Sequence, residues 1–173
     1  MTDPMRRRLV AFAPFPLRLL LGFGYVYHGY TKLFTGEGNE SFEGMLSGMG
    51  VPLSGLGAYG IGGFEFFGGI LLVLGVAVRT VAALGVIEMI VAAVTVHWTA
   101  GFDFLNVAGT ASDGSMQFGL PGYEVNVLYI AGFLSLLLSG AGAFGLPRIR
   151  IRDEHATPTS DHEKPSSEPS HVD

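Results

Sequence analysis

The sequence predicts an all-α integral membrane protein: a four-helix bundle with both termini in the cytoplasm (N-in/C-in) and a disordered acidic C-terminal tail. Three observations predict this fold. Hydrophobic residues make up 49% of the 173 residues and charged residues only 14%, against about 25% charged in an average soluble domain. Four apolar stretches each approach the ~20 residues that a helix needs to cross about 30 Å of hydrocarbon. They are also rich in glycine, which is commoner in transmembrane helices than in soluble ones.

The chain begins with a basic cytoplasmic segment, 1–13, which precedes the first predicted span, 14–34. A basic segment before an apolar run is also typical of a signal peptide. This run, however, is long and contains Arg18, His28 and Lys32, and no small-x-small cleavage site follows it. We therefore expect a retained transmembrane helix.

The remaining spans are predicted at 56–78, 80–100 and 123–145, which gives a membrane domain over 14–147. The turn at 77–79 is too short for anything but a tight helical hairpin, so the second and third spans should be antiparallel neighbours. Within the first long loop, segment 41–49 has some amphipathic character and is expected to form a short helix at the membrane surface.

The distribution of basic residues predicts the orientation, because cytoplasmic loops of membrane proteins are enriched in Lys and Arg. The loops 35–55 and 101–122 contain acidic residues and no basic ones. The arginines outside the spans lie at the N-terminus, in the turn between spans two and three, and after span four: Arg6, Arg7, Arg8, Arg79, Arg148, Arg150 and Arg152. We therefore expect a multi-pass protein of the plasma membrane with both long loops outside the cell.

The C-terminal segment 148–173 combines the last basic cluster with an acidic tail. Residues 153–173 hold six of the fifteen acidic residues and several Pro and Ser. Such a segment cannot bury enough apolar surface to offset the entropy of ordering it, so we expect it to be disordered.

Composition also excludes several classes of function. The chain has no cysteine, which rules out disulfides, thiolate metal sites and iron–sulfur ligation. The net charge of −5 argues against a nucleic-acid partner, since such a protein needs a basic face to neutralise phosphates. No metal site is predicted.

Ionisable residues within the spans are the candidate functional groups, because a charge in the membrane is costly and usually faces the bundle interior. Helical phase places Arg18, Tyr25 and Lys32 on one stripe of the first span, with His28 at its edge. We expect the outer half of the bundle core to hold one cluster with charges of both signs. Its members are His28, Lys32, Glu65, His97 and Glu124.

Most of these residues also have a structural interpretation. Lys32 and Arg18 can extend to the two membrane surfaces, and His97 with Trp98 can form part of an interfacial aromatic belt. Glu124 can cap the fourth span, whose first turn favours an acid. His28 and Glu65 are the hardest to explain by structure alone.

Glu88 is expected to stand apart from this cluster. It lies nine residues before His97, so the two should point to opposite sides of a straight helix. We therefore expect Glu88 to be a structural partner near the inner leaflet, with Arg18 as the candidate partner.

The order of these residues resembles the DoxX family. In LRLLLGFGYVYHGYTKLF, the family's Arg, Gly and HG-x-x-K pattern is matched by Arg18, Gly22, His28, Gly29 and Lys32. In the second span, its Glu, Gly-Gly, Gly and Arg pattern is matched by Glu65, Gly68, Gly69, Gly75 and Arg79. The family's His at the end of span three matches His97, and its Glu opening span four matches Glu124. The similarity covers 14–145, without the loop 101–122, and Glu88 has no counterpart in the pattern.

The resemblance implies a four-helix membrane protein related to the DoxD-type subunit of thiosulfate:quinone oxidoreductase, and to subunits of membrane complexes that handle oxidative stress. We expect a quinone-associated subunit of a membrane redox complex. Catalytic roles fall to His28 as hydrogen-bond donor to a quinone carbonyl, Lys32 as stabiliser of negative charge and Glu65 as proton relay. Arg18, Tyr25, His97 and Glu124 are candidate binding residues. Tyr25, Phe64 and Phe66 would line the ring slot.

The expected partners are the lipid bilayer and other membrane or peripheral redox subunits, which would carry the electrons. No covalently bound cofactor is expected; quinone is the candidate ligand. Haem is disfavoured, although His28 and His97 both lie in the outer half and could bridge one. Two other functions stay open: a small-solute or proton transporter, which at four spans needs a homo-oligomer, and a non-catalytic scaffold.

Overall fold

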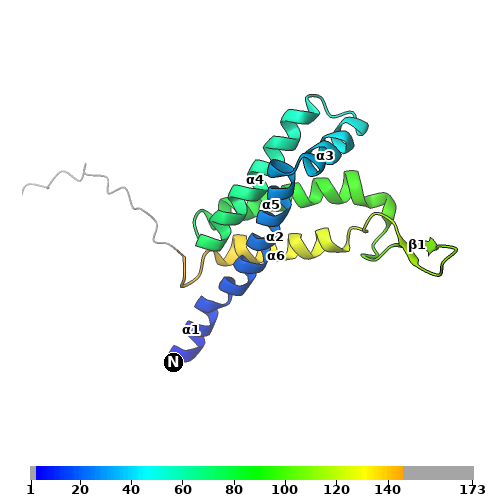
Figure 1. Ribbon diagram of the computed structural model, residues 1–173. Coiled ribbons are helices and arrows are strands. Elements are labelled where there is room, and N and C mark those ends of the chain that lie inside the picture. Colours follow the sequence, from blue (N-terminus) through cyan, green and yellow to red (C-terminus); the bar gives the residue numbers. More distant parts are fainter. Residues whose placement is uncertain (1–2, 146–173) are drawn as a thin grey trace, which may run out of the picture.

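The computed structural model describes residues 3–145, which are mainly helical (Figure 1). The predicted tail and the basic residues 148–152 lie outside the described residues. The helices are α1 (Pro4–Phe12), α2 (Pro14–Phe34), α3 (Gly36–Gly48), α4 (Ser54–Leu74), α5 (Val78–Ala92) and α6 (Glu124–Ser139). A π-helical turn (Ala93–His97) and a 3-10 turn (Trp98–Ala100) extend α5, and two short strands, β1 (Val107–Thr110) and β2 (Met116–Phe118), form a hairpin before α6.

Within residues 3–145, three helices are long and apolar enough to cross a membrane. They are Pro4–Phe34 with 31 residues, in which α1 continues into α2, then Ser54–Leu74 with 21 and Val78–Ala100 with 23. The fourth predicted span is apolar but shorter, since α6 has 16 residues and ends at Ser139, before Gly140, whose φ of 73° breaks the helix. The chain therefore has the helices of a membrane protein.

The long helices are arranged as two pairs. Helix α2 packs along α4, and α5 packs along α6, while α4 and α5 share few contacts beyond the turn that joins them. The prediction that spans two and three pack side by side is therefore wrong beyond that turn. The pairs meet near the α4–α5 turn and diverge toward α3 at one outer end and the hairpin at the other (Figure 1).

The α4–α5 turn is as tight as predicted but begins earlier. Gly75 (φ 76°) and Ala77 (φ 48°) both adopt the left-handed conformation. Glycine adopts this conformation without steric cost. The left-handed Gly75 therefore ends α4 at Leu74 rather than at the predicted residue 78. Ala77 then starts α5 at Val78.

Glycines let the backbones of α2 and α4 touch. A Cβ atom added at Gly29 would meet main-chain atoms of Gly62 and Phe66, and one at Gly69 would lie 2.6 Å from the Gly22 carbonyl oxygen. Small residues at such crossings allow helices to pack closely in membranes. This contact brings the polar residues of the two helices together.

Substituting Gly69 by Ala is expected to destabilise the protein by about 1–3 kcal/mol, because the methyl group would collide with rigid backbone rather than with a flexible side chain. Thermal unfolding in detergent measures the effect. Gly63→Ala on the same helix is the matched control, since a Cβ there meets nothing within 4 Å. Equal melting temperatures for the two variants would contradict this packing.

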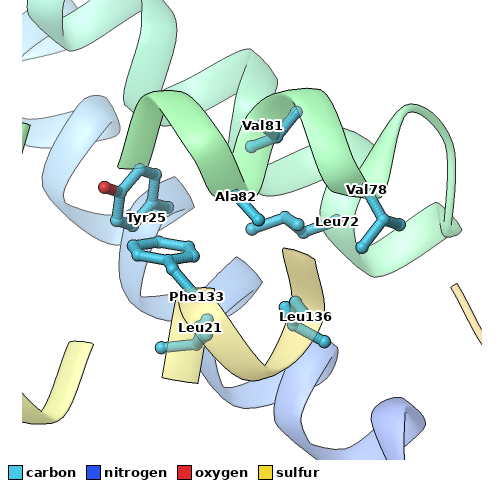
Figure 2. Close-up of a cluster of buried hydrophobic side chains, with 8 residues drawn as sticks. All are labelled: Leu21, Tyr25, Leu72, Val78, Val81, Ala82, Phe133 and Leu136. Carbon is cyan, nitrogen blue, oxygen red and sulfur yellow. The ribbon is translucent and has the colours of Figure 1, made fainter. Parts of the chain in front are cut away.

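The hydrophobic core lies where the two pairs meet. Figure 2 shows eight buried side chains from α2, α4, α5 and α6, with the ring of Tyr25 beside that of Phe133. They are Leu21, Tyr25, Leu72, Val78, Val81, Ala82, Phe133 and Leu136. The core thus joins the pairs near their common end and leaves the outer ends apart.

The outer segments contain more structure than the sequence predicts. The short helix expected at 41–49 is present but begins at Gly36, where the Thr35 hydroxyl accepts a hydrogen bond from the Gly38 N–H. The hairpin of β1 and β2 was not predicted. At its turn, hydrogen bonds from the hydroxyl and N–H of Ser115 hold the pKa of Asp113 below its ordinary value.

Candidate functional site

An ion pair joins α2 to α4 at their close approach. The Lys32 ammonium lies 2.5 and 2.6 Å from the two carboxylate oxygens of Glu65. The side chains are 17% and 6% exposed. Helix α3 covers the pair, because the Phe42 ring lies 4.3 Å from Lys32 Nζ and the Asn39 amide donates to the Lys32 carbonyl. Lys32 is thus held inward against Glu65.

A second polar contact links α2 to α5. The phenol of Tyr25, which is 1% exposed, donates a hydrogen bond of 2.6 Å to Glu88 Oε2. The Glu88 carboxyl also interacts with that of Glu65. The four side chains therefore form one polar chain across three helices, in the order Lys32, Glu65, Glu88, Tyr25.

Aromatic rings surround the Tyr25 end of the polar chain. The Tyr25 ring centroid lies 4.9 Å from that of Phe133, 6.0 Å from that of Phe64 and 6.1 Å from that of Tyr129. Phe66 instead contacts Phe34 and Phe67, away from Tyr25. Of the three rings expected to line the quinone slot, Tyr25 and Phe64 are therefore in contact, and Phe66 is not part of that contact.

His28 lies beside the polar chain but is exposed. The charges of Glu65 and Lys32 are close enough to act on its imidazole. The rest of the predicted stripe is buried or half-buried: Arg18, Gly22, Tyr25, Gly29 and Lys32. His28, at the edge of the stripe, therefore presents an imidazole on the surface next to buried charges.

Arg18 fastens the two helix pairs together at their common end. Its guanidinium donates to the carbonyls of Leu72 and Val73, each at 2.9 Å, and to that of Ala141 at 2.5 Å. It also lies 3.5 Å from the Phe144 carbonyl oxygen. A cation there satisfies the last carbonyls of α4 and matches the negative end of the helix dipole.

The expected pairing of Glu88 with Arg18 is wrong. Arg18 binds backbone carbonyls, whereas Glu88 belongs to the polar chain. Depth explains this placement. Counted from the common end of the helix pairs, Tyr25 lies seven residues beyond Arg18, Glu65 eight before Val73 and Glu88 ten beyond Val78. All three therefore lie about 10–15 Å along their helices from that end, at 1.5 Å per residue.

His97 and Glu124 do not join this cluster. His97 Nδ1 lies 2.7 Å from the Pro121 carbonyl oxygen, and Glu124 accepts a hydrogen bond of 3.2 Å from the Phe104 N–H. Both therefore anchor the loop 101–122. The single outer cluster of five residues that the sequence predicts is divided in two. Within residues 3–145, no group of three or more His, Asp or Glu residues is arranged to hold a metal ion.

The model of the DoxX family matches residues 13–98, which contain α2 to α5 and the whole polar chain. The chain is also 33% identical over 131 residues to an uncharacterised protein of Haemophilus influenzae, covering 75% of this chain and 84% of that protein. The chain belongs to the DoxX family. No solved structure matches it.

The structure gives most of the DoxX-like pattern a packing role. Arg18 ties helix ends together, Gly29 and Gly69 admit the facing helix, Gly75 turns the chain, and Arg79 lies 3.3 Å from the Leu138 carbonyl oxygen near the end of α6. Lys32 and Glu65 of the pattern form the ion pair. His28 is the member whose side chain is left exposed beside that pair.

Proposed function

We propose that this DoxX-family membrane protein is a quinone-associated subunit of a redox complex in the plasma membrane. The observation that carries the proposal is the polar chain itself: proton-binding groups from three apolar helices, packed against aromatic rings, with an imidazole exposed beside them. Reduction of a quinone adds protons as well as electrons, so its site needs proton carriers next to an apolar surface. The His28 imidazole and the Lys32 ammonium are the donors that would hold a quinone head group in this proposal.

In this proposal His28 donates a hydrogen bond to a quinone carbonyl, and Lys32 stabilises the negative charge that develops on reduction. Glu65 relays the proton. The chain contains no cysteine, and a partner redox subunit supplies the electrons. Quinone diffuses in the bilayer, and the exposed side of α2 at His28 is where it approaches.

The proposal includes four crossings, with both termini in the cytoplasm. Helix α1 with its arginines and the turn with Arg79 lie toward the common end of the helix pairs, and α3 and the hairpin lie at the outer ends (Figure 1). That distribution agrees with the preference of basic residues for the cytoplasmic side. Helix α6, with 16 residues, rises about 24 Å and crosses by thinning the bilayer locally or by using its flanking residues.

Quinone binding tests the proposal directly. Titrating the purified protein in detergent with a short-chain quinone, followed by calorimetry, should give saturable binding. His28→Asn should weaken it about tenfold, which corresponds to losing one hydrogen bond of ~1.4 kcal/mol. His97→Asn is the matched control, because His97 contacts the Pro121 carbonyl at the loop, and its affinity should stay unchanged.

Absence of saturable binding to the wild-type protein would refute the proposal. Equal loss of affinity in the two histidine variants would refute the assignment of the head-group site to His28. A transporter would instead give flux into proteoliposomes that depends on Glu65, without quinone binding.

A further inference from the structure

We infer that Glu88 is a neutral carboxylic acid that stores a proton between Tyr25 and Glu65. It is a proton-holding residue outside the three groups to which the proposed quinone chemistry assigns roles. The inference goes beyond that function, because it concerns the resting protein and needs no quinone.

The first argument is that the charges of the polar chain leave Glu88 without a neutralising cation among the described residues. Lys32 contacts both oxygens of Glu65, so one ammonium and one carboxylate neutralise each other. No cation within residues 3–145 is in ion-pair contact with Glu88. An unpaired carboxylate inside an apolar helix is costly, and a group in that position binds a proton instead.

The hydrogen bonds carry the second step. The Tyr25 phenol donates to Glu88 Oε2, so that oxygen accepts. A protonated Glu88 has one O–H left to donate, and the Glu65 carboxylate with which it interacts is an acceptor. Every group then has a partner: Tyr25 donates to Glu88, Glu88 donates to Glu65, and Lys32 donates to Glu65. An ionised Glu88 would instead set two acceptors against each other.

Among the residues that the structure describes, the other ionisable groups near Glu88 do not supply a positive charge in ion-pair contact with its carboxyl. His28 on α2 is exposed. Tyr129 on α6 stacks on the Tyr25 ring. The Arg18 guanidinium donates its hydrogen bonds to backbone carbonyls at the common end of the helix pairs. Glu88 therefore stands between a phenol and a paired carboxylate, and its O–H would be the donor that faces Glu65.

Infrared spectroscopy tests the inference. The wild-type protein at neutral pH, in a detergent without ester groups, should show a carboxylic-acid C=O band that shifts in heavy water. Glu88→Gln should abolish the band. Glu124→Gln, which removes another carboxyl at the start of a predicted span, should leave it unchanged. Tyr25→Phe should move the band to higher frequency, because the C=O loses its hydrogen-bond donor.

A band that persists in Glu88→Gln, or no band in the wild-type protein, would overturn the inference. Glutamine is the uncharged analogue of the protonated acid, so this variant should also unfold at the wild-type temperature; a large decrease would show that the negative charge of Glu88 matters. If Glu88→Gln does not fold, an unshifted band in Tyr25→Phe overturns the inference instead. The measurement uses no quinone, so a failure of quinone binding leaves its outcome unaffected.

Discussion

Replacing Arg18 by Met will lower the free energy of unfolding by at least about 3 kcal/mol. Arg18 is 1% exposed and donates to carbonyls of Leu72, Val73 and Ala141. Methionine fills similar volume but donates nothing, and each buried carbonyl left unsatisfied costs about 1–3 kcal/mol. Unfolding of the detergent-solubilised protein, followed by circular dichroism, measures the loss.

Two further variants sharpen this prediction. Arg79→Met removes an exposed arginine whose carbonyl contact is longer, at 3.3 Å, and should cost much less. Arg18→Lys should recover only part of the stability, because an ammonium cannot span two helix ends as a planar guanidinium does. If Arg18→Met and Arg79→Met are equally stable, Arg18 does not fasten the helix pairs.

Replacing Glu65 by Leu is the second large effect, and we expect a loss of about 3–5 kcal/mol. The substitution leaves the Lys32 ammonium, whose side chain is 17% exposed, without the carboxylate that lies 2.5 Å away. Removing one partner of a buried ion pair is costly, whereas replacing both by apolar side chains is often close to neutral. The double variant Lys32→Met/Glu65→Leu should therefore be more stable than Glu65→Leu.

This non-additivity is the measurement that matters. Chemical unfolding of the wild-type protein, the two single variants and the double variant forms a double-mutant cycle, which isolates the coupling between the two side chains. A double variant that loses the sum of the two single effects would show that Lys32 extends to the membrane surface and gains nothing from Glu65.

The helices were largely predictable from the sequence because apolar length is a strong signal. The first span, 14–34, coincides with α2 (Pro14–Phe34). The errors lie at helix ends, where single backbone conformations decide. Gly75 and Gly140, both with positive φ, end α4 and α6 four to six residues before the predicted ends of those spans. Glycines also occur inside these helices, so composition does not reveal which glycine breaks a helix.

The candidate site was predictable only in part. Helical phase correctly placed Lys32 and Tyr25 on the buried stripe of α2. Phase says which side of a helix a residue occupies but not which helix lies opposite, so Glu88 was assigned to Arg18 instead of Tyr25. His97 is the last residue of the π-helical turn Ala93–His97, which shifts the helical phase. A phase comparison across that turn carries no information on whether Glu88 and His97 share a face.

The Arg18 contacts hold the two helix pairs together at their common end, so any rotation between the pairs would turn about that end. These contacts fasten the α2–α4 pair to the segment after α6 at one end, while the other ends of the two pairs, as described within residues 3–145, lie apart (Figure 1). Each helix pair extends about 30 Å from this common end, so a rotation of ~10° between the pairs would displace the loops at their far ends by about 5 Å. Lys32 and Glu65 both belong to the α2–α4 pair, so their ion pair would stay intact during this rotation. Tyr25 and Glu88 belong to different helix pairs, so such a rotation would break the hydrogen bond between them.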